Sequence, residues 1–196
     1  KNQILNEVKK YLAFLQFERN LSTNTINSYW LDLEKYIVYM IDLYAINSLK
    51  SIKLDYIKKY VQDINEFSDR NITESSTINR LISSIRNFHK YLVINKITIK
   101  DPSKLLRSIK LKQNLPVVLS VDEIDKIINS INITDKNGLR NKALIMLLYS
   151  SGLRVSEIVS LNLTNLYLDE DVIRIFGKGR KERLVPIGGL AKKEII

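Results

Sequence analysis

Apolar residues recur at helical spacing in four stretches of the first hundred residues. The spacing predicts helices over 3–18, from Ser22 through Met40, over 53–66 and over 77–92. Each stretch gathers its large aliphatic and aromatic residues on one face, and Ser22 is a suitable N-cap for the second helix. Four amphipathic helices with short connections predict a compact bundle.

The helical rhythm stops after this bundle. Residues 107–116 (RSIKLKQNLP) are basic and without periodicity, which is typical of an exposed linker. Ser120 and Glu123 then form a capping-box pattern that opens a new helix. We therefore expect a first domain over 1–106, a linker over 107–116 and a second domain over 117–196.

The second domain has a mixed pattern. Helices are predicted over 120–131 and over 139–149, with a short one after Gly152. Two β-rich runs, 172–176 and 183–187, flank the turn at 177–180 and predict a β-hairpin. Tyr149 and Tyr167 are interpreted as core residues. The fold class is therefore mainly α, with a helical bundle followed by a mixed α/β domain that carries a small hairpin sheet.

Composition excludes several classes of protein. Cysteine is absent and His89 is the single histidine, so disulfides, thiolate metal sites and a histidine zinc cluster are excluded, and we expect no metal and no cofactor. No apolar run reaches eighteen residues and no leader pattern occurs. These features predict a soluble cytoplasmic protein without a membrane partner.

Charge gives the first functional indication. The net charge is +10, and residues 1–113 hold nineteen basic against eleven acidic side chains. A basic helical domain attracts polyanions, of which nucleic acid is the commonest in a cell. Charge alone fits an ordinary solvated surface equally well, so the indication depends on where the charges lie.

The segment 151–161 (SGLRVSEIVSL) contains the first candidate for chemistry. Gly152 permits a tight turn, and Arg154 then stands at a helix start, where backbone N–H groups favour an anion. A guanidinium there can hold two phosphate oxygens in a fork. The structural alternative is an ion pair between Arg154 and Glu157, one turn further on.

The segment 176–186 (FGKGRKERLVP) contains the second candidate. Lys178 lies between two glycines at the predicted hairpin tip, where the backbone can approach a ligand closely. A lysine at this position can enter a DNA groove and donate a proton. The structural alternative is a solvated turn.

In this order, the two segments resemble the catalytic domain of the tyrosine site-specific recombinases, and most of all the Xer branch. Lys178 follows Arg154 by twenty-four residues. In the first domain, 18–36 resembles the first DNA-contacting helix of the family, 76–92 resembles the last helix of its core-binding, SAM-like domain, and DPSKLL at 101–106 matches the exit from that domain. The resemblance covers essentially the whole chain.

The resemblance implies strand cleavage and rejoining on DNA through a 3′-phosphotyrosyl intermediate. By match, Arg154 is the first catalytic arginine, which stabilises the charged transition state. Lys178 is the general acid toward the leaving 5′-oxygen, and Glu157 orients Arg154. The implied partners are a double-stranded recombination site and other recombinase protomers in a tetrameric synapse.

DNA contacts are predicted at the starts and outer faces of two helices and at the hairpin tip. On helix 77–92 the polar residues point away from the apolar stripe, as a helix in the major groove requires. The linker would let the two domains close on duplex DNA as a clamp. The predicted contact residues are Arg19, Ser22, Thr23, Asn24, Thr25, Tyr29, Asn79, Arg80, Ser83, Arg86, Lys90, Arg180 and Lys181.

The sequence also departs from the family pattern. The HxxR box and the nucleophilic tyrosine that the family requires do not occur after Lys178. We therefore expect the 196-residue chain to bind DNA without cleaving it, while the family is enzymatic. The alternative readings are a truncated, non-catalytic DNA-binding regulator and a helical repressor or structural bundle with coincidental motifs.

Within the family, the chain begins directly at the core-binding domain. This start favours a simple Xer-type enzyme over a large phage integrase. Chromosome or plasmid dimer resolution, linked to chromosome partition and cell division, is the expected process. Integration by a mobile element is the alternative.

Overall fold

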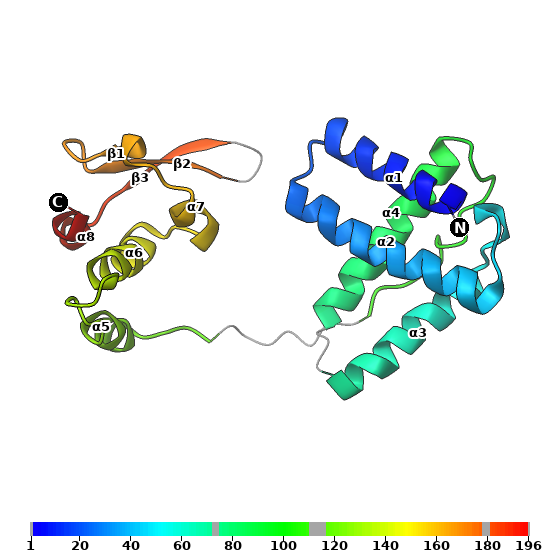
Figure 1. Cartoon of the computed structure of the whole chain (residues 1–196), viewed down its shortest axis with the longest axis horizontal. Helices are drawn as coiled ribbons and strands as arrows, with labels where there is room; N and C mark the ends of the chain where they lie inside the picture. The colour runs from blue at the N-terminus through cyan, green and yellow to red at the C-terminus, as the bar shows by residue number, and fades with distance from the viewer. Residues whose placement is uncertain (1, 72–74, 110–116, 178–180, 196) are drawn as a thin grey trace. The chain divides into compact units, whose positions relative to one another are not determined.

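The computed structural model describes residues 2–71, 75–109, 117–177 and 181–195. The chain divides into two compact units, 1–114 and 115–196. Their helices and strands are labelled in Figure 1. None of the described helices has the length and apolar character that crossing a bilayer requires.

Unit 1 is the predicted helical bundle. Its helices are α1 (Asn2–Phe17), α2 (Thr23–Tyr44), α3 (Leu54–Asn71) and α4 (Ser75–Ile94), with a 3-10 turn at Leu49–Ser51. α3 continues five residues beyond the predicted end. As expected, α2 begins at an N-cap, where the Ser22 Oγ accepts a hydrogen bond from the Thr25 backbone N–H at 3.3 Å.

The core of unit 1 is built around α2, which packs against α1, α3 and α4. All four helices turn an apolar stripe inward, and the centre is aromatic. The rings of Tyr11 and Phe88 lie 5.5 Å apart, and those of Tyr36 and Tyr60 also lie 5.5 Å apart. Burial of this continuous apolar surface accounts for the stability of the bundle, because burial is the dominant favourable term in folding.

His89 lies inside this core and is fully buried. Its Nε2 is 2.8 Å from the Tyr36 hydroxyl, whereas its Nδ1 has no hydrogen-bond partner among the described residues. Burial lowers the pKa of His89 to about 4. The imidazole is therefore neutral in the folded protein near pH 7, as a helix residue in the core.

An ion pair with a buried carboxylate joins α2 to α4. The carboxylate of Asp32, which is buried, accepts hydrogen bonds from the Arg80 guanidinium and, at 3.0 Å, from the Ser84 Oγ. Burial raises the pKa of Asp32, and the neighbouring Arg80 opposes that rise. Arg80 is thus engaged in holding two helices together.

Unit 2 contains α5 (Val121–Asn129), α6 (Gly138–Ser151), α7 (Val155–Val159), a 3-10 turn at Leu163–Asn165, β1 (Leu166–Tyr167), β2 (Val172–Phe176), β3 (Glu182–Pro186) and α8 (Gly189–Ile195). The capping box at the start of α5 is present, with Ser120 and Glu123 bonded to each other's backbone N–H groups. In Figure 1, α6 lies between α5 and α7.

The three strands form one antiparallel sheet in the order β1-β2-β3. The predicted hairpin is confirmed as β2 and β3, although β3 begins one residue earlier than expected. Strand β1 was not predicted, because two residues are too short a stretch to show alternation. Ile173 and Ile175 of β2 face the core of the unit.

Tyr149 corrects one sequence-based interpretation. It was expected in the core but is 50% exposed, while Leu147 of the same helix is buried. α6 is apolar on nearly every side, so periodicity could not identify the face that packs inward. Tyr167 is partly buried, on strand β1.

Candidate functional site

The turn between α6 and α7 presents Arg154. Gly152 ends α6 in the left-handed region, with φ at 58°, a conformation that favours glycine. Arg154 follows two residues later as the N-cap of α7, in an extended conformation. α7 has five residues, and the Arg154 backbone N–H donates to the Glu157 Oε2 at 2.8 Å. The anion that this helix start accommodates is therefore the protein's own carboxylate.

Glu157 is the centre of this site. Its side chain is 4% exposed and accepts hydrogen bonds from two arginines. The Arg154 Nη1 donates to Oε1 at 2.9 Å. From strand β3, the Arg183 Nη1 donates to Oε1 at 2.8 Å and the Arg183 Nη2 donates to Oε2 at 2.9 Å. These three residues are called the Arg154–Glu157–Arg183 cluster.

The electrostatics of the cluster favour an anion. Hydrogen bonds from Arg183, and then from the Arg154 backbone, lower the pKa of Glu157 to about 2, so its carboxylate is ionised at neutral pH. Two guanidiniums share this one negative charge, which leaves the cluster with a net charge of +1. The Arg154 side chain is 71% exposed, so its guanidinium can reach a ligand while one nitrogen stays bonded to Glu157.

The hairpin tip adjoins the same cluster. The Gly177 N–H donates to the Lys181 carbonyl at 2.8 Å. A Cβ at Gly177 would lie 3.1 Å from the Arg183 Nη1 and 3.8 Å from the Glu157 Oε1, so Gly177 lies beside the cluster. Lys181 is exposed. The predicted site residues Lys178 and Arg180 lie outside the described residues.

The polar face of α4 carries several predicted DNA contacts. Ser83, Arg86 and Lys90 are exposed, and together with Asn87, Asp101 and Lys104 they line a shallow pocket of about 500 Å³. Three of its lining residues are cations and one, Asp101, is an anion. The pocket is therefore suited to a phosphate group.

Two other predicted contacts on α4 make internal bonds. Arg80 is paired with Asp32, and its side chain remains 41% exposed. The Asn79 amide exchanges two hydrogen bonds of 2.8 Å with the backbone of Ile109, which fixes the chain beyond α4. Both residues therefore have a structural role, and a DNA contact by either of them remains a prediction.

The predicted contacts near the start of α2 lie on an exposed turn. Arg19, Ser22, Thr23 and Asn24 are exposed, and the guanidinium of Arg19 lies 5.8 Å from the centre of the Phe14 ring. Thr25 is bonded to Ser22, both through its backbone N–H and through its hydroxyl at 2.9 Å. Tyr29 packs partly against the bundle core. Four of the six predicted contacts near this helix start are thus exposed, whereas Tyr29 contributes to the packing.

The sequence pattern was not used to predict a role for Arg183 or Asp32, although each occupies an inward position of its element. Arg183 alternates with Val185 and Ile187, so it occupies an inward position of its strand. Asp32 lies three residues after Tyr29 and four before Tyr36, on the apolar face of α2. A charged residue at an inward position indicates a buried partner.

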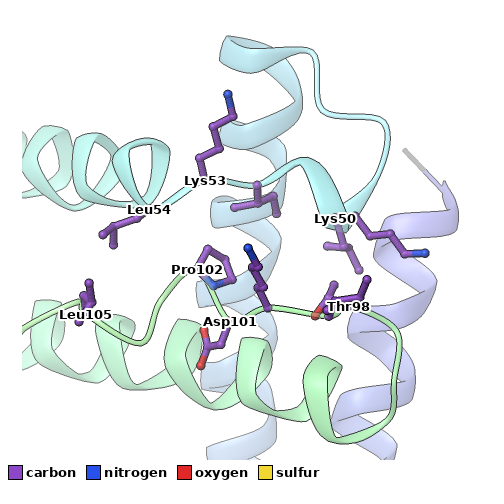
Figure 2. Close-up of a pocket in the computed structure, with 11 residues that line it drawn as sticks. Lys50, Lys53, Leu54, Thr98, Asp101, Pro102 and Leu105 are labelled. Atoms are coloured by element: carbon purple, nitrogen blue, oxygen red, sulfur yellow. The ribbon is translucent and has the colours of Figure 1, made fainter.

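Unit 1 also contains an apolar pocket of about 550 Å³. It is formed by the segment before α3 and by the segment after α4. Figure 2 shows Leu54 and Leu105 on opposite sides, with Lys53 extending away from the pocket. The Asp101 carboxylate at its edge is bonded to the Ser103 N–H at 2.8 Å. The predicted site residues do not line this pocket, and among the described residues no group of three side chains could hold a metal ion.

Two family models match the chain. Residues 8–96 match the model described as "Phage integrase, N-terminal SAM-like domain", and residues 117–195 match "Phage integrase family". The tyrosine recombinase XerD of Oceanobacillus iheyensis is 40% identical over 94% of this chain and 61% of its own length. The XerD of Halalkalibacterium halodurans is 37% identical over 97% of this chain and 62% of its own length.

Solved structures share the fold. A lambda integrase dimer bound to a COC′ core site has a TM-score of 0.70 at 14% identity, over 92% of this chain and 61% of that one. XerH site-specific recombinase bound to its difH substrate has a TM-score of 0.64 at 24% identity, over 97% of this chain and 55% of that one. The chain spans about three fifths of the length of the curated relatives given above.

Proposed function

Because the chain belongs to the phage integrase family of tyrosine recombinases, we propose that the protein carries out site-specific DNA recombination. Strand cleavage and rejoining would proceed through a 3′-phosphotyrosine intermediate. The observation that carries this proposal is the similarity to XerD, which extends over 94% of the chain at 40% identity. The Arg154–Glu157–Arg183 cluster supports it, because phosphoryl transfer on DNA requires a fixed cation at the phosphate.

In this reaction Arg154 binds the scissile phosphate and stabilises the charge that develops on it. Its exposed guanidinium keeps donors for the phosphate while Glu157 holds its position. Lys178 is the general acid that protonates the leaving 5′-oxygen. This role is supported by its place in the sequence directly after Gly177, which contacts the cluster.

Unit 1 supplies most of the affinity for duplex DNA. Residues 1–113 carry most of the positive charge, and exposed Arg86 and Lys90 line a pocket on α4. Arg19 and the start of α2 make the second set of contacts, and Lys181 and Arg180 make the contacts at the hairpin tip. The partners are a recombination site and further protomers of the recombinase, in line with the lambda integrase dimer and the XerH complex.

The process is chromosome or plasmid dimer resolution in the cytoplasm, with consequences for chromosome partition and cell division. The XerD relatives favour this process over integration by a mobile element. Integration remains the second candidate because the family models are those of phage integrases.

The test uses the 196-residue chain itself. It contains no tyrosine after Tyr167 and one histidine, His89, so it should bind duplex DNA without forming a covalent adduct. Binding is measured by fluorescence anisotropy, and adducts are sought by denaturing electrophoresis with a nicked substrate that traps cleavage. Absence of DNA binding at low salt would overturn the proposed function, and a covalent adduct would contradict the expectation that the 196 residues do not contain the nucleophilic tyrosine.

A further inference from the structure

We propose that Arg183 is a positioning residue for Arg154, acting through Glu157; the inference rests on the proposed role of Arg154 as the phosphate-binding cation. Arg183 comes from β3 and Arg154 from the start of α7, and the buried Glu157 carboxylate joins them. Arg183 holds both oxygens of that carboxylate, at 2.8 and 2.9 Å. The fork geometry fixes the plane of the carboxylate, which a single bond cannot do.

The two arginines of the cluster differ in exposure. The Arg183 side chain is 38% exposed and the Arg154 side chain is 71% exposed. Arg183 also makes two side-chain bonds to Glu157, whereas Arg154 makes one. Arg183 is therefore the principal counterion of the carboxylate, and Arg154 is the cation that remains accessible to a ligand.

This division of tasks has an electrostatic consequence. With Arg183 present, the carboxylate is neutralised and Arg154 keeps an uncompensated positive charge. Without Arg183, Glu157 and Arg154 would form an isolated pair with no net charge. The Arg154 guanidinium would then turn toward both carboxylate oxygens, and its attraction for a phosphate would fall.

Arg183 also connects the cluster to the hairpin tip. A Cβ at Gly177 would lie 3.1 Å from the Arg183 Nη1, so the hairpin backbone packs directly against this guanidinium. A side chain at 177 would therefore require the Arg183 guanidinium to shift by a few tenths of an ångström. The Arg183 side chain therefore lies between the Glu157 carboxylate of the helix that Arg154 begins and Gly177, the residue that precedes Lys178 in the sequence.

The test is NMR spectroscopy of the 196-residue chain and its Arg183→Met variant. The pKa of the Glu157 carboxyl, about 2 in the native protein, should rise by about one unit or more, since an adjacent cation lowers a carboxyl pKa by about 1–3 units. The Arg154 Nε–Hε signal should shift on addition of a mixed-sequence DNA duplex to the native chain and should shift much less in Arg183→Met. Arg183→Lys should give an intermediate Glu157 pKa, because it restores the charge without the fork.

The matched control is Arg174→Met, which removes an arginine from the same sheet. Arg174 lies over the rings of Tyr167 and Phe176, at 5.6 and 5.8 Å, and is not one of the two arginines that bond the Glu157 carboxylate. This variant should leave the Glu157 pKa and the Arg154 signal as they are in the native chain. If both variants changed these signals alike, the effect would be one of general sheet stability and the proposal would be overturned.

The two hypotheses fail differently. An unchanged Glu157 pKa and Arg154 signal in Arg183→Met would overturn the positioning role and leave DNA binding untouched. If the Arg154 Nε–Hε signal of the native chain does not shift on addition of DNA, the proposed phosphate contact of Arg154 is overturned. The Glu157 titration would still decide whether Arg183 positions Arg154. If Arg183→Met fails to fold, Arg183→Lys decides the question, because an unshifted Glu157 pKa in that variant contradicts the proposal.

Discussion

Two buried carboxylates, one in each unit, are paired with arginine in different ways. Asp32 in unit 1 faces Arg80, and burial keeps its pKa above the ordinary value. Glu157 in unit 2 faces Arg154 and Arg183, and their hydrogen bonds hold its pKa at about 2. With one arginine, the charges balance and the pair joins two helices. With two, the cluster keeps one positive charge that Glu157 does not balance.

The difference shows why an arginine at a predicted contact position does not by itself indicate binding. Arg80 and Arg154 are both partly exposed and both bonded to a carboxylate. The distinguishing feature is the second cation on Glu157, which is visible only when the strand and the helix are brought together. The predictions below test this distinction.

The largest effect is expected at Arg154. In a cleavage-competent protein that contains this sequence, Arg154→Ala should lower the cleavage rate by about 100- to 1,000-fold, as the loss of one transition-state donor typically does. Binding should be largely spared if, as proposed, unit 1 supplies most of the affinity for DNA. Single-turnover cleavage and anisotropy on the same duplex separate the two effects.

A sulfur substitution sharpens the assignment. A substrate with sulfur at the 5′-bridging position should restore cleavage by Lys178→Ala, because a thiolate leaves without a proton. It should not restore cleavage by Arg154→Ala, which lacks charge stabilisation. Equal responses of the two variants would contradict both role assignments.

His89 extends the comparison to a buried ionisable group whose pKa is set mainly by burial, with only a smaller, opposing effect of Asp101. Its pKa is about 4 in the folded protein and about 6.5 when unfolded. Between these two pKa values the unfolded chain binds more protons than the folded chain. The free energy of unfolding therefore has its full value above pH 6.5 and falls as the pH drops toward 4. The loss is about 3 kcal/mol by linkage. Urea unfolding at several pH values should show this decrease in the free energy of unfolding for the native chain and not for His89→Gln.

Arg80 and Arg86 form a matched pair on α4. Arg80→Ala should reduce the free energy of unfolding by about 1–3 kcal/mol, because Asp32 loses its counterion in a buried setting. Arg86 is exposed, so Arg86→Ala should change stability by less than about 0.5 kcal/mol. Chemical unfolding measures both. Equal losses would mean that the Asp32 pair does not hold α2 to α4.

The smallest expected effect is on the salt dependence of DNA binding. Each phosphate that the chain neutralises contributes about 0.9 to the slope of log affinity against log salt. Arg86→Ala should therefore lower the slope by about 0.9 if this guanidinium contacts a phosphate. Anisotropy titrations at several salt concentrations measure the slope. A slope near zero for the native chain would contradict DNA binding through Arg86, Lys90 and Lys104 of unit 1.

The sequence predicted the helices well because their apolar periodicity is long and regular. It also predicted the hairpin, since the turn at 177–180 separates two β-rich runs. The sequence did not predict which charged residues pair. Arg183 contacts Glu157 at a sequence separation of 26 residues, and Arg80 contacts Asp32 at a separation of 48. Such contacts depend on how elements pack, which periodicity does not specify.

The candidate site was predicted in part. The ion pair of Arg154 with Glu157, weighed as the structural alternative, is present, and the Arg154 side chain is nevertheless 71% exposed. Its role as a phosphate ligand stays a prediction. Tyr149 was misplaced because α6 is apolar on most sides. The role of Lys178 remains a prediction, as do the individual DNA contacts.

The single tryptophan gives the two units different optical properties. Trp30 packs partly buried against the core of unit 1, with the Lys9 Nζ 6.0 Å from its ring centre, whereas unit 2 contains Tyr149 and Tyr167 but no tryptophan. Excitation where tyrosine does not absorb therefore reports on unit 1 alone. Fluorescence and circular dichroism recorded on one sample should give coincident transitions only if the units unfold together. The chain thus carries an intrinsic probe that can follow the Asp32 pair without interference from the Glu157 cluster.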